Sequence, residues 1–403
     1  MPRRPTAVAR LAGAALALAL GLSLAGCTGH GSTVAGGVLP GASDSPGAGP
    51  APTLTALDAV AGQVPWSKPL SLTAVHGTLT LVTVLDSDGY PVDGALSAAG
   101  WTSTSTLIPG RQYAATATVK STSGATSQIQ ATFTASPADK VLHAVIAPGN
   151  GSVVGVAQPV IVRFDQKVSG RAARLAVLDR LKVITNPPVA GAWRWYNSFE
   201  VHYHGEHFWK SGTTIRIETH LGLLRVPGTD VWGSTRITTS DVTVGKDYES
   251  TVDITQHIMV VRLDGKIIRT IKVSTGRDKY PTKGGVHIVL TREKSHTYNS
   301  GTVGIPTDGP GGYYEKLPWS MRISNGGAFV HANPQTVGVQ GRRNVSHGCV
   351  NTSVTDARWF YYHSQLGDPV TIIHAVVQPV RWDAGMADWN YTWAQWQAGN
   401  LDG

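Results

Sequence analysis

Cysteine is almost absent from this sequence, which contains two cysteines in 403 residues, Cys27 and Cys349. Exported proteins that use cysteine for stability usually carry it in pairs that form disulfides. A cysteine without a partner is either an inert, buried apolar residue or a reactive nucleophile. The role of each cysteine therefore has to be inferred from the residues around it.

The N-terminal apolar run is too short and too rich in small residues for a transmembrane span. Residues 1–26 carry three arginines and then an uncharged stretch up to Cys27, the pattern of a signal peptide. Small residues directly precede Cys27, in Leu24-Ala25-Gly26, as in a bacterial lipobox, where the cysteine becomes an acylated first residue. We expect a lipoprotein signal peptide over 1–26, lipidation with palmitate at Cys27, and anchoring in the cell membrane on its wall-facing side. The alternative is an ordinary secretory signal with a chance cysteine.

Charged residues are also scarce, at 15% of the chain, and residues 27–50 contain almost none. This segment is mainly Gly, Pro, Ser and Ala, and it predicts a flexible tether because it cannot bury enough apolar surface to fold. The formal net charge is +8, and removal of the three arginines of 1–26 leaves +5. A basic exported protein suits an anionic wall or membrane surface. No basic-aromatic motif appears, so nucleic acid is not an expected partner.

Residues 51–136 are rich in Thr, Ser, Ala and Val and predict a first β-sandwich. The segments 78–85, 113–121 and 129–135 alternate in polarity or are β-branched, and turn residues separate them. Short strands at this spacing are typical of β-sandwiches. A similar pattern over 137–245 predicts a second sandwich of similar size.

The second sandwich contains strands predicted at 193–203 and 213–219, and a cluster of histidines around the first of them. His202 and His204 would share one face of a strand, with Glu206 close by. Two histidines and a carboxylate suit zinc. The alternative, which we favour, is a polar strand face and loop without a metal.

Residues 246–375 form a further β-rich domain with long loops, which are frequent places for function. Residues 258–277 predict a hairpin that turns at Asp264-Gly265, and 284–290 predict another strand. A loop rich in Gly and Pro follows at 301–314. A helix is predicted after Cys349, because Ser353 and Asp356 have the spacing of a helix cap.

The last segment, 376–403, is rich in tryptophan. Trp389, Trp393 and Trp396 have the spacing of one helix face. That face would either stack on sugars or pack on the preceding domain, and packing is favoured because a short terminal helix needs a buried face.

The strongest chemical signal is the sequence SHGCVN at 346–351. A thiol nucleophile needs its thiolate, an imidazole to take the proton, a group that orients the imidazole, and N–H donors for an oxyanion. The N–H groups of Gly348 and Cys349 would suit the last role. His347 and His331 both suit the second, and spacing alone does not choose between them.

The segment FVHANPQTVGVQGRRNVSHGCVN, residues 329–351, resembles the signature of L,D-transpeptidases with a YkuD-type catalytic domain. The resemblance covers nearly the whole chain. It extends over a lipobox, two immunoglobulin-like domains, the catalytic domain at 246–375 and a Trp-rich C-terminal subdomain at 376–403, as in the actinobacterial, mycobacterial-type enzymes. The fold it implies is mainly β, with a short helix in the catalytic domain.

The resemblance implies a role for each residue of the site. Cys349 would be the nucleophile and His331 the general base and acid. The backbone carbonyl of Ala332 would orient His331, Gly348 would contribute a backbone donor to the oxyanion hole, and His347 would support the cysteine loop. Relatives often have serine at the position of Ala332.

The resemblance also implies groups that contact the substrate. Asn351, Tyr313 and Tyr298 would border or bind it, and the loop 298–316 would be a flap over the donor pocket. A tryptophan common in relatives is replaced here by Gln335, which would change the shape of one pocket wall.

The implied activity is the formation of 3→3 cross-links between peptidoglycan stem peptides, without a cofactor or metal. Cys349 would attack a tetrapeptide donor, D-alanine would leave, and the amine of an acceptor stem would resolve the thioester. Carbapenem-type β-lactams would be covalent inhibitors. The alternatives are an L,D-carboxypeptidase that uses water as acceptor, and a catalytically silent, wall-associated scaffold lipoprotein. The sequence does not set an oligomeric state.

Overall fold

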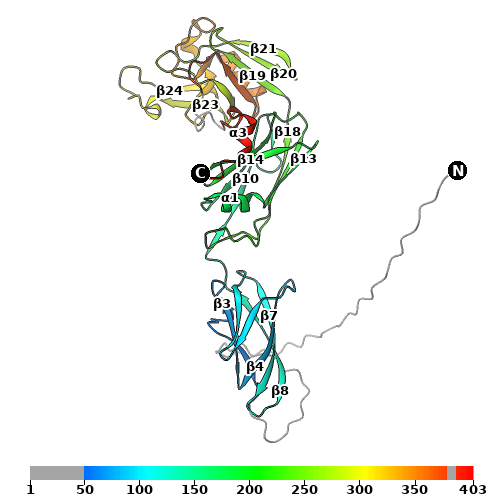
Figure 1. Ribbon diagram of the computed structural model, residues 1–403. Coiled ribbons are helices and arrows are strands. Elements are labelled where there is room, and N and C mark those ends of the chain that lie inside the picture. The colour runs from blue at the N-terminus through cyan, green and yellow to red at the C-terminus, as the bar shows by residue number, and fades with distance from the viewer. Residues whose placement is uncertain (1–49, 379–386, 403) are drawn as a thin grey trace, which may run out of the picture. The chain divides into compact units, whose positions relative to one another are not determined.

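The structure is a computed structural model that describes residues 50–378 and 387–402 (Figure 1). The predicted signal peptide, Cys27 and nearly all of the predicted tether lie outside the described residues. The chain is mainly β, as predicted, and divides into two compact units between Pro137 and Ala138. Among the described residues, no helix has both the length and the apolar character needed to cross a membrane.

The first unit is a sandwich of two four-stranded sheets, in the orders β1-β3-β6-β5 and β2-β8-β7-β4. Its strands are β1 Thr53–Ala56, β2 Gln63–Val64, β3 Pro69–Val75, β4 Gly77–Asp86, β5 Gly94–Ser97, β6 Gly100–Thr106, β7 Gln112–Ser121 and β8 Thr126–Ala135. The alternation along β7 buries Tyr113, Ala115, Ala117 and Val119. Because side chains of a strand point alternately to its two faces, this pattern places one face of β7 in the core.

The second unit begins with another sandwich, in the sheet orders β10-β12-β15-β14 and β11-β18-β16-β13, with β9 and β17 paired separately. Its elements are β9 Lys140–Leu142, β10 Ala144–Ala147, β11 Val153–Val154, β12 Val160–Phe164, α1 Arg171–Leu178, β13 Leu181–Asn186, β14 Gly191–Asn197, β15 Glu200–Gly205, β16 Thr214–Thr219, β17 Val231–Gly233 and β18 Thr238–Val244. The strand predicted at 193–203 is wrong as a single element: it is the hairpin of β14 and β15. Helix α1 was not predicted, and it buries Ala173 and Val177 on one face.

The remainder of the second unit contains two further sheets, in the orders β21-β20-β19-β27-β22 and β23-β24-β25-β26. The elements are β19 Tyr248–Asp253, β20 Ile258–Leu263, β21 Lys266–Lys272, β22 Gly285–Ile288, β23 Thr291–Asn299, η1 Ser300–Val303, β24 Tyr314–Arg322, β25 Phe329–Ala332, η2 Pro334–Thr336, β26 Val350–Thr352, α2 Val354–His363 and β27 Pro369–Ile373. Apolar residues of both sheets and of α2 share one core, which includes Met259, Met321, Val330 and Phe360.

Two local predictions in this region are confirmed. The β20–β21 hairpin turns at Asp264 and Gly265, whose φ angles are 50° and 76°, as a type I′ turn requires. Helix α2 begins after Ser353, whose Oγ accepts the Asp356 N–H at 3.1 Å.

The C-terminal segment does not form the single helix that the tryptophan spacing predicts. It consists of η3 Ala387–Asn390 and α3 Trp393–Gln397, and Thr392 caps α3 through a capping box with Gln395. This box starts a new helix between the first and second tryptophans, because it satisfies the N–H groups of a helix start. Helix α3 lies against β14 (Figure 1).

The C-terminal segment contacts both parts of the second unit. The Trp389 Nε1–H donates to the Ala157 carbonyl at 2.8 Å, while Asn390 exchanges two hydrogen bonds with the backbone of Val286. The Gly155 N–H also donates directly to the Leu366 carbonyl at 2.7 Å. The second sandwich and the region that contains Cys349 are therefore joined by hydrogen bonds at several points.

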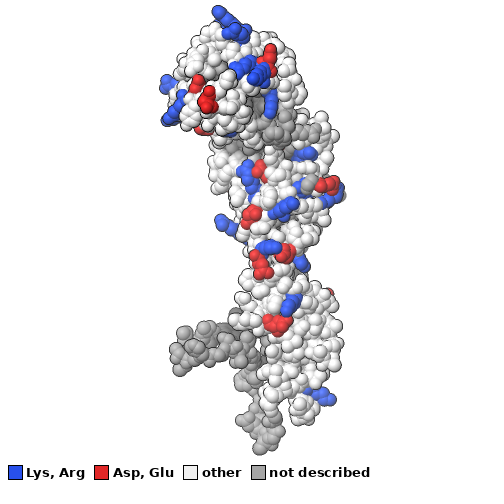
Figure 2. All heavy atoms as spheres, turned by 90° about the vertical axis from the view of Figure 1, so that its left-hand side faces the viewer, with Lys and Arg blue, Asp and Glu red and all other residues white. Residues whose placement is uncertain are grey.

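On the face shown in Figure 2, basic and acidic side chains are interspersed among larger uncharged areas.

Candidate active site

His331 and Cys349 come together because β25 and β26 are neighbouring parallel strands. Val330 pairs with Val350 and His331 with Asn351. Cys349 directly precedes β26, so its side chain projects on the same face of the sheet as that of Asn351, next to His331. Both His331 and Cys349 line one cavity. The structure thus brings together the two residues that the resemblance pairs.

Cys349 is partly exposed and lies beside an apolar cluster of Tyr298, Leu317 and Phe329. Its Sγ lies 3.8 Å from the Gly327 carbonyl, to which the thiol donates. Burial raises the pKa of the Cys349 thiol to about 11, and the contributions of the Phe329 backbone and Arg322 in the opposite direction are smaller. The thiol of Cys349 is therefore neutral in the free protein at neutral pH, and its proton has to be removed during attack.

His331 is 3% exposed, and its Nδ1 lies 2.9 Å from the Ala332 carbonyl. A carbonyl only accepts, so Nδ1 carries the proton and Nε2 keeps a free lone pair. Burial lowers the pKa of His331 to about 4, although the hydrogen bond to Ala332 opposes this, so the imidazole is neutral. A neutral imidazole in this tautomer is a base and not an acid in the free protein.

Two cavities meet at Cys349. The smaller, of about 270 Å³, is lined by His331, Asn351 and Gln335, among others. The larger, of about 740 Å³, extends past Phe329 and Arg322. Four residues line both cavities: Tyr298, Tyr313, His347 and Cys349. The sulfur can therefore be approached from two sides.

The turn before Cys349 is fixed by Ser346, a residue of the motif to which no role was assigned from the sequence. Its Oγ accepts the Gly348 N–H at 3.1 Å and donates to the Cys349 carbonyl at 2.6 Å. Gly348 has a φ of 118°, which a residue with a side chain rarely adopts. Because the Gly348 N–H is engaged with Ser346, it would have to exchange that bond to serve an oxyanion. Thr282 also contacts the turn, donating to the Gly348 carbonyl at 2.9 Å.

His347 lines both cavities at Cys349 and contacts Tyr313 of the flap. The Arg277 guanidinium donates to its Nε2 at 2.6 Å, and its ring lies 5.0 Å from that of Tyr313. Burial and then Arg277 lower the pKa of His347. Arg277 was missed from the sequence, because 70 residues separate it from the histidine it contacts and no local pattern marks that contact.

The residues predicted to contact substrate differ in their environment. Asn351 is buried and its Oδ1 has no hydrogen-bond partner, which leaves an acceptor at the cavity wall. Tyr313 lines both cavities, and burial raises the pKa of its hydroxyl. The hydroxyl of Tyr298 instead donates to Ser320 Oγ at 2.8 Å, and its ring lies 4.6 Å from that of His331. Tyr298 is therefore placed to position His331 rather than to hydrogen-bond a ligand.

The flap is shorter than the predicted range 298–316. β23 continues to Asn299 and β24 begins at Tyr314, so the loop between them, including η1, covers 300–313. Its closing contacts are a hydrogen bond from the Tyr313 N–H to Ser300 Oγ at 3.0 Å and one from the Ser300 N–H to the Tyr313 carbonyl at 3.0 Å. These contacts join the two ends of the loop beside Cys349.

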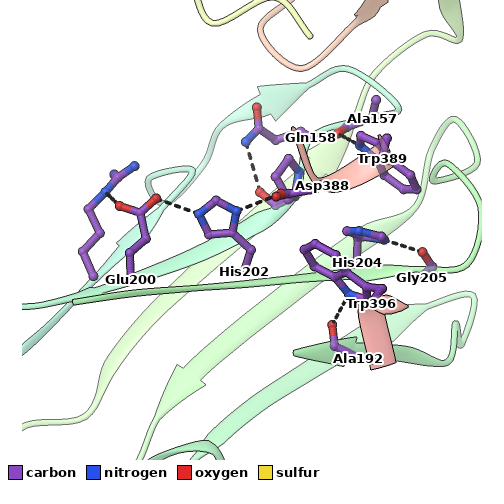
Figure 3. A network of polar contacts seen from close by, with 12 residues as sticks. Ala157, Gln158, Ala192, Glu200, His202, His204, Gly205, Asp388, Trp389 and Trp396 are labelled. Carbon is purple, nitrogen blue, oxygen red and sulfur yellow. Dashed lines mark hydrogen bonds and ion pairs between the residues drawn. The ribbon is translucent and has the colours of Figure 1, made fainter. Parts of the chain in front are cut away.

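The histidines of β15 lie under the C-terminal segment (Figure 3). Among the described residues, no group of three or more ligating side chains is arranged to hold a metal. His202 is buried between Glu200 and Asp388, at 2.6 Å and 2.8 Å. His204 lies against the rings of Trp389 and Trp396, at 4.0 Å and 3.9 Å. The strand face carries polar side chains, as expected, but it is buried because the C-terminal segment covers it.

Comparison with known proteins gives a family match for the sandwich region and another for the region that contains Cys349. A family described as the L,D-transpeptidase catalytic domain matches residues 247–372, and one described as a bacterial Ig domain matches 61–223. L,D-transpeptidase 2 of Mycobacterium tuberculosis (strain CDC 1551 / Oshkosh) is 39% identical over 335 residues, which cover 82% of this chain and 80% of the relative. L,D-transpeptidase 5 of M. tuberculosis (strain H37Rv) is 30% identical, covering 86% and 76%.

A solved structure of an L,D-transpeptidase in complex with imipenem is similar to part of this chain. It has a TM-score of 0.50 and 28% identity, and the match covers 58% of this chain and 99% of that chain. Together with the relatives, the site and the fold, this shows the family. The chain belongs to the L,D-transpeptidases, acyltransferases of peptidoglycan cross-linking, and carries a YkuD-type catalytic domain after bacterial immunoglobulin-like domains.

Proposed function

We propose that this protein forms 3→3 cross-links in peptidoglycan through a thioester on Cys349. The observation that carries the proposal is the pairing of a neutral thiol with a neutral imidazole in one cavity. The Ala332 carbonyl fixes the Nδ1–H tautomer of His331, so its free Nε2 lone pair is available to a proton from Cys349. A base of this kind acts during attack and does not need a preformed thiolate.

In the first half-reaction, the Cys349 sulfur attacks the carbonyl that follows the third residue of a tetrapeptide stem. The thiol proton passes to His331, and the S–C bond forms as the carbonyl oxygen becomes an oxyanion. Collapse of this intermediate breaks the C–N bond to D-alanine, whose amine leaves with the proton that His331 had taken. The energy of the peptide bond is retained in the thioester, so no nucleotide is required.

In the second half-reaction, the side-chain amine of an acceptor stem attacks the thioester. A C–N bond forms, the C–S bond breaks, and His331 passes the amine proton to the departing sulfur. The two cavities at Cys349 give donor and acceptor separate routes to the same atom. The flap over 300–313 limits the access of water, which is the competing acceptor.

Analysis of products from purified muropeptides tests this proposal. We expect release of D-alanine, a thioester adduct of the mass of the tripeptide, and cross-linked dimers. Cys349→Ser in the full chain should yield none of these and serves as the matched control. Tripeptide monomers without dimers would show an L,D-carboxypeptidase, and an unreactive Cys349 would favour a scaffold role.

We further propose that carbapenems acylate Cys349. The structure of an L,D-transpeptidase has been solved with imipenem bound, and this chain contains the same type of catalytic domain. Intact-mass spectrometry of the full chain with imipenem should show one adduct, which Cys349→Ser abolishes.

We also propose that the mature protein is anchored through lipid on Cys27, at the wall-facing side of the cell membrane. The lipobox-like residues before Cys27 support this proposal. Cys27→Ala should release the protein from the membrane fraction, whereas Cys349→Ser should not.

A further inference from the structure

The two cavities that meet at Cys349 differ in charge. Among the residues described at the larger cavity, the formally charged side chains are Lys279, Lys283 and Arg322, and none is acidic. At the smaller cavity, the single formally charged side chain among those described is Glu315. A substrate group that carries charge will therefore have different energies on the two sides of the sulfur.

Arg322 is the cation best placed to recognise an anion in the larger cavity. It ends β24, is half-buried, and its guanidinium lies 4.5 Å from the centre of the Phe329 ring. Its Nη1 makes one long hydrogen bond, of 3.4 Å, to the Ser324 carbonyl. A guanidinium has five N–H donors in a fork that matches a carboxylate, so donors of Arg322 remain for a ligand.

Glu315 lies near the other end of the same strand and is partly buried. Its Oε1 is 3.5 Å from Gln335 Nε2, a weak contact, and Gln335 lines the same cavity. A carboxylate is an acceptor for several donors, so an incoming ammonium can bind here without breaking an ion pair.

We propose that the protein separates its two substrates by charge: Arg322 binds a carboxylate of the donor stem in the larger cavity, and Glu315 binds the ammonium of the acceptor stem in the smaller one. This inference rests on the proposed function. The donor must place its scissile carbonyl at Cys349 while its carboxylates avoid Glu315. The acceptor arrives at neutral pH as an ammonium, which the three cations of the larger cavity repel. It loses one proton to water before the resulting amine attacks the thioester.

The donor side is tested with pairs of tetrapeptide stems that differ at one carboxylate. One stem has a free carboxylate on the diaminopimelate side chain or on the terminal D-alanine, and its partner has that group amidated. We expect the full-length wild type to form the acyl-enzyme about tenfold faster with the free stem of one of these pairs, because a charge-assisted hydrogen bond is lost on amidation. In Arg322→Gln the ratio of the two rates should fall to near one.

The ratio removes the indirect effects of the substitution. Arg322 also acts on the Cys349 thiol, so Arg322→Gln will change the rate of acylation with every stem. That change cancels between the free and amidated stems. Arg358→Gln, which removes an exposed arginine on α2 that lines neither cavity, should keep the wild-type ratio and controls for net charge.

The acceptor side is tested on the preformed acyl-enzyme. Glu315→Gln should raise the concentration of acceptor amine needed for half-maximal thioester consumption about fivefold, without changing the rate of acylation. Asp264→Asn in the β20–β21 turn is the control, because Asp264 is exposed, lines neither cavity, and asparagine suits that turn.

The outcomes separate this inference from the proposed function. If the wild type releases no D-alanine from any stem, the proposed function itself fails. If D-alanine is released but amidation changes neither rate, or if Arg322→Gln preserves the ratio, the assignment of Arg322 is wrong. An effect of Glu315→Gln on acylation instead of thioester consumption would overturn the assignment of the smaller cavity.

Discussion

Two buried histidines in the second unit, His202 and His331, have opposite charge states. His202 is 1% exposed and His331 is 3% exposed, so burial disfavours the charged form of both. His202 contacts two carboxylates, those of Asp388 and Glu200 (Figure 3). Burial alone would lower its pKa, but Asp388 and then Glu200 outweigh it and raise the pKa to about 9. His331 has a carbonyl as its polar partner, and its pKa falls to about 4.

The comparison teaches that the partners, and not the depth of burial, decide whether a histidine is structural or chemical. An imidazolium whose two N–H groups both donate to carboxylates has no lone pair to offer and joins β15 to the C-terminal segment. A neutral imidazole held by one carbonyl keeps a lone pair toward the cavity. Histidine therefore stabilises the fold at position 202 and is available for proton transfer at position 331.

The largest effect is expected for His331. His331→Ala should reduce acylation of Cys349 by about 10²- to 10⁴-fold, because the general base is lost. Acyl-enzyme formation followed by intact mass measures this rate. His202→Gln is the matched control and should acylate at close to the wild-type rate. Equal losses in both variants would show that His331 acts only through the fold.

The next largest effect is expected where the C-terminal segment contacts β15, at Asp388 and His202. Asp388→Ala should destabilise the second unit by about 3–5 kcal/mol, because it leaves the buried His202 without its strongest partner. The urea midpoint of the transition of the second unit, monitored by tryptophan fluorescence, measures this change. Asp388→Asn keeps a hydrogen-bond acceptor and should lose less. An unchanged midpoint in Asp388→Ala would mean that His202 is neutral.

The two histidines should also give opposite dependence of stability on pH. His202 has a raised folded-state pKa, so its contribution is complete below its ordinary value of 6.5 and is lost as the pH rises through about 9, on the order of 3 kcal/mol. His331 has a lowered pKa, so stability is lost as the pH falls from 6.5 through about 4. The unfolding midpoint against pH measures both.

Variants isolate each histidine from the other titrating groups. The difference between wild type and His202→Gln should shrink as the pH rises from 6.5 to about 9, and the difference between wild type and His331→Gln should change only below pH 6.5. A loss of the wild-type advantage over His202→Gln on the acid side would contradict the assigned charge of His202.

Local features of the sequence predicted much of the fold. Alternation along 113–121 predicted β7, the Asp264-Gly265 pair predicted the β20–β21 turn, and Ser353 with Asp356 predicted the start of α2. These succeed because each depends on residues within a few positions. The single helix predicted from the tryptophan spacing is wrong, because another local signal competes with that spacing. The capping box of Thr392 starts α3 inside the predicted helix.

The site could be predicted only in part. The sequence pattern and the resemblance indicated Cys349 and His331, but their protonation states depend on burial and on partners such as Ala332 that only the fold sets. The burial of His202 could not be predicted, because Asp388, which covers it, is 186 residues away in the chain. Contacts between distant segments leave no periodic signal.

A third histidine, His347, sharpens the comparison with the smallest effect. It is partly buried, accepts a hydrogen bond from Arg277, and lies against Tyr313 of the flap. Unlike His202, it has no carboxylate partner among the described contacts. Unlike His331, its Nε2 is occupied by a hydrogen bond. We expect His347→Ala to slow acylation about two- to tenfold, the range of one lost hydrogen bond and its packing. D-alanine release from a tetrapeptide stem measures this loss.

A double-mutant cycle decides whether that loss passes through Arg277. If Arg277 acts by holding His347 against the flap, Arg277→Gln and His347→Ala together should cost little more than either alone, because each removes the same contact. Additive losses would mean that Arg277 contacts the substrate independently. If His347→Ala abolishes acylation while His331→Ala does not, His347 is the base. In that case the free Nε2 of His331 has no catalytic use, and the Nε2 of His347 has to release the Arg277 guanidinium before it can take the thiol proton.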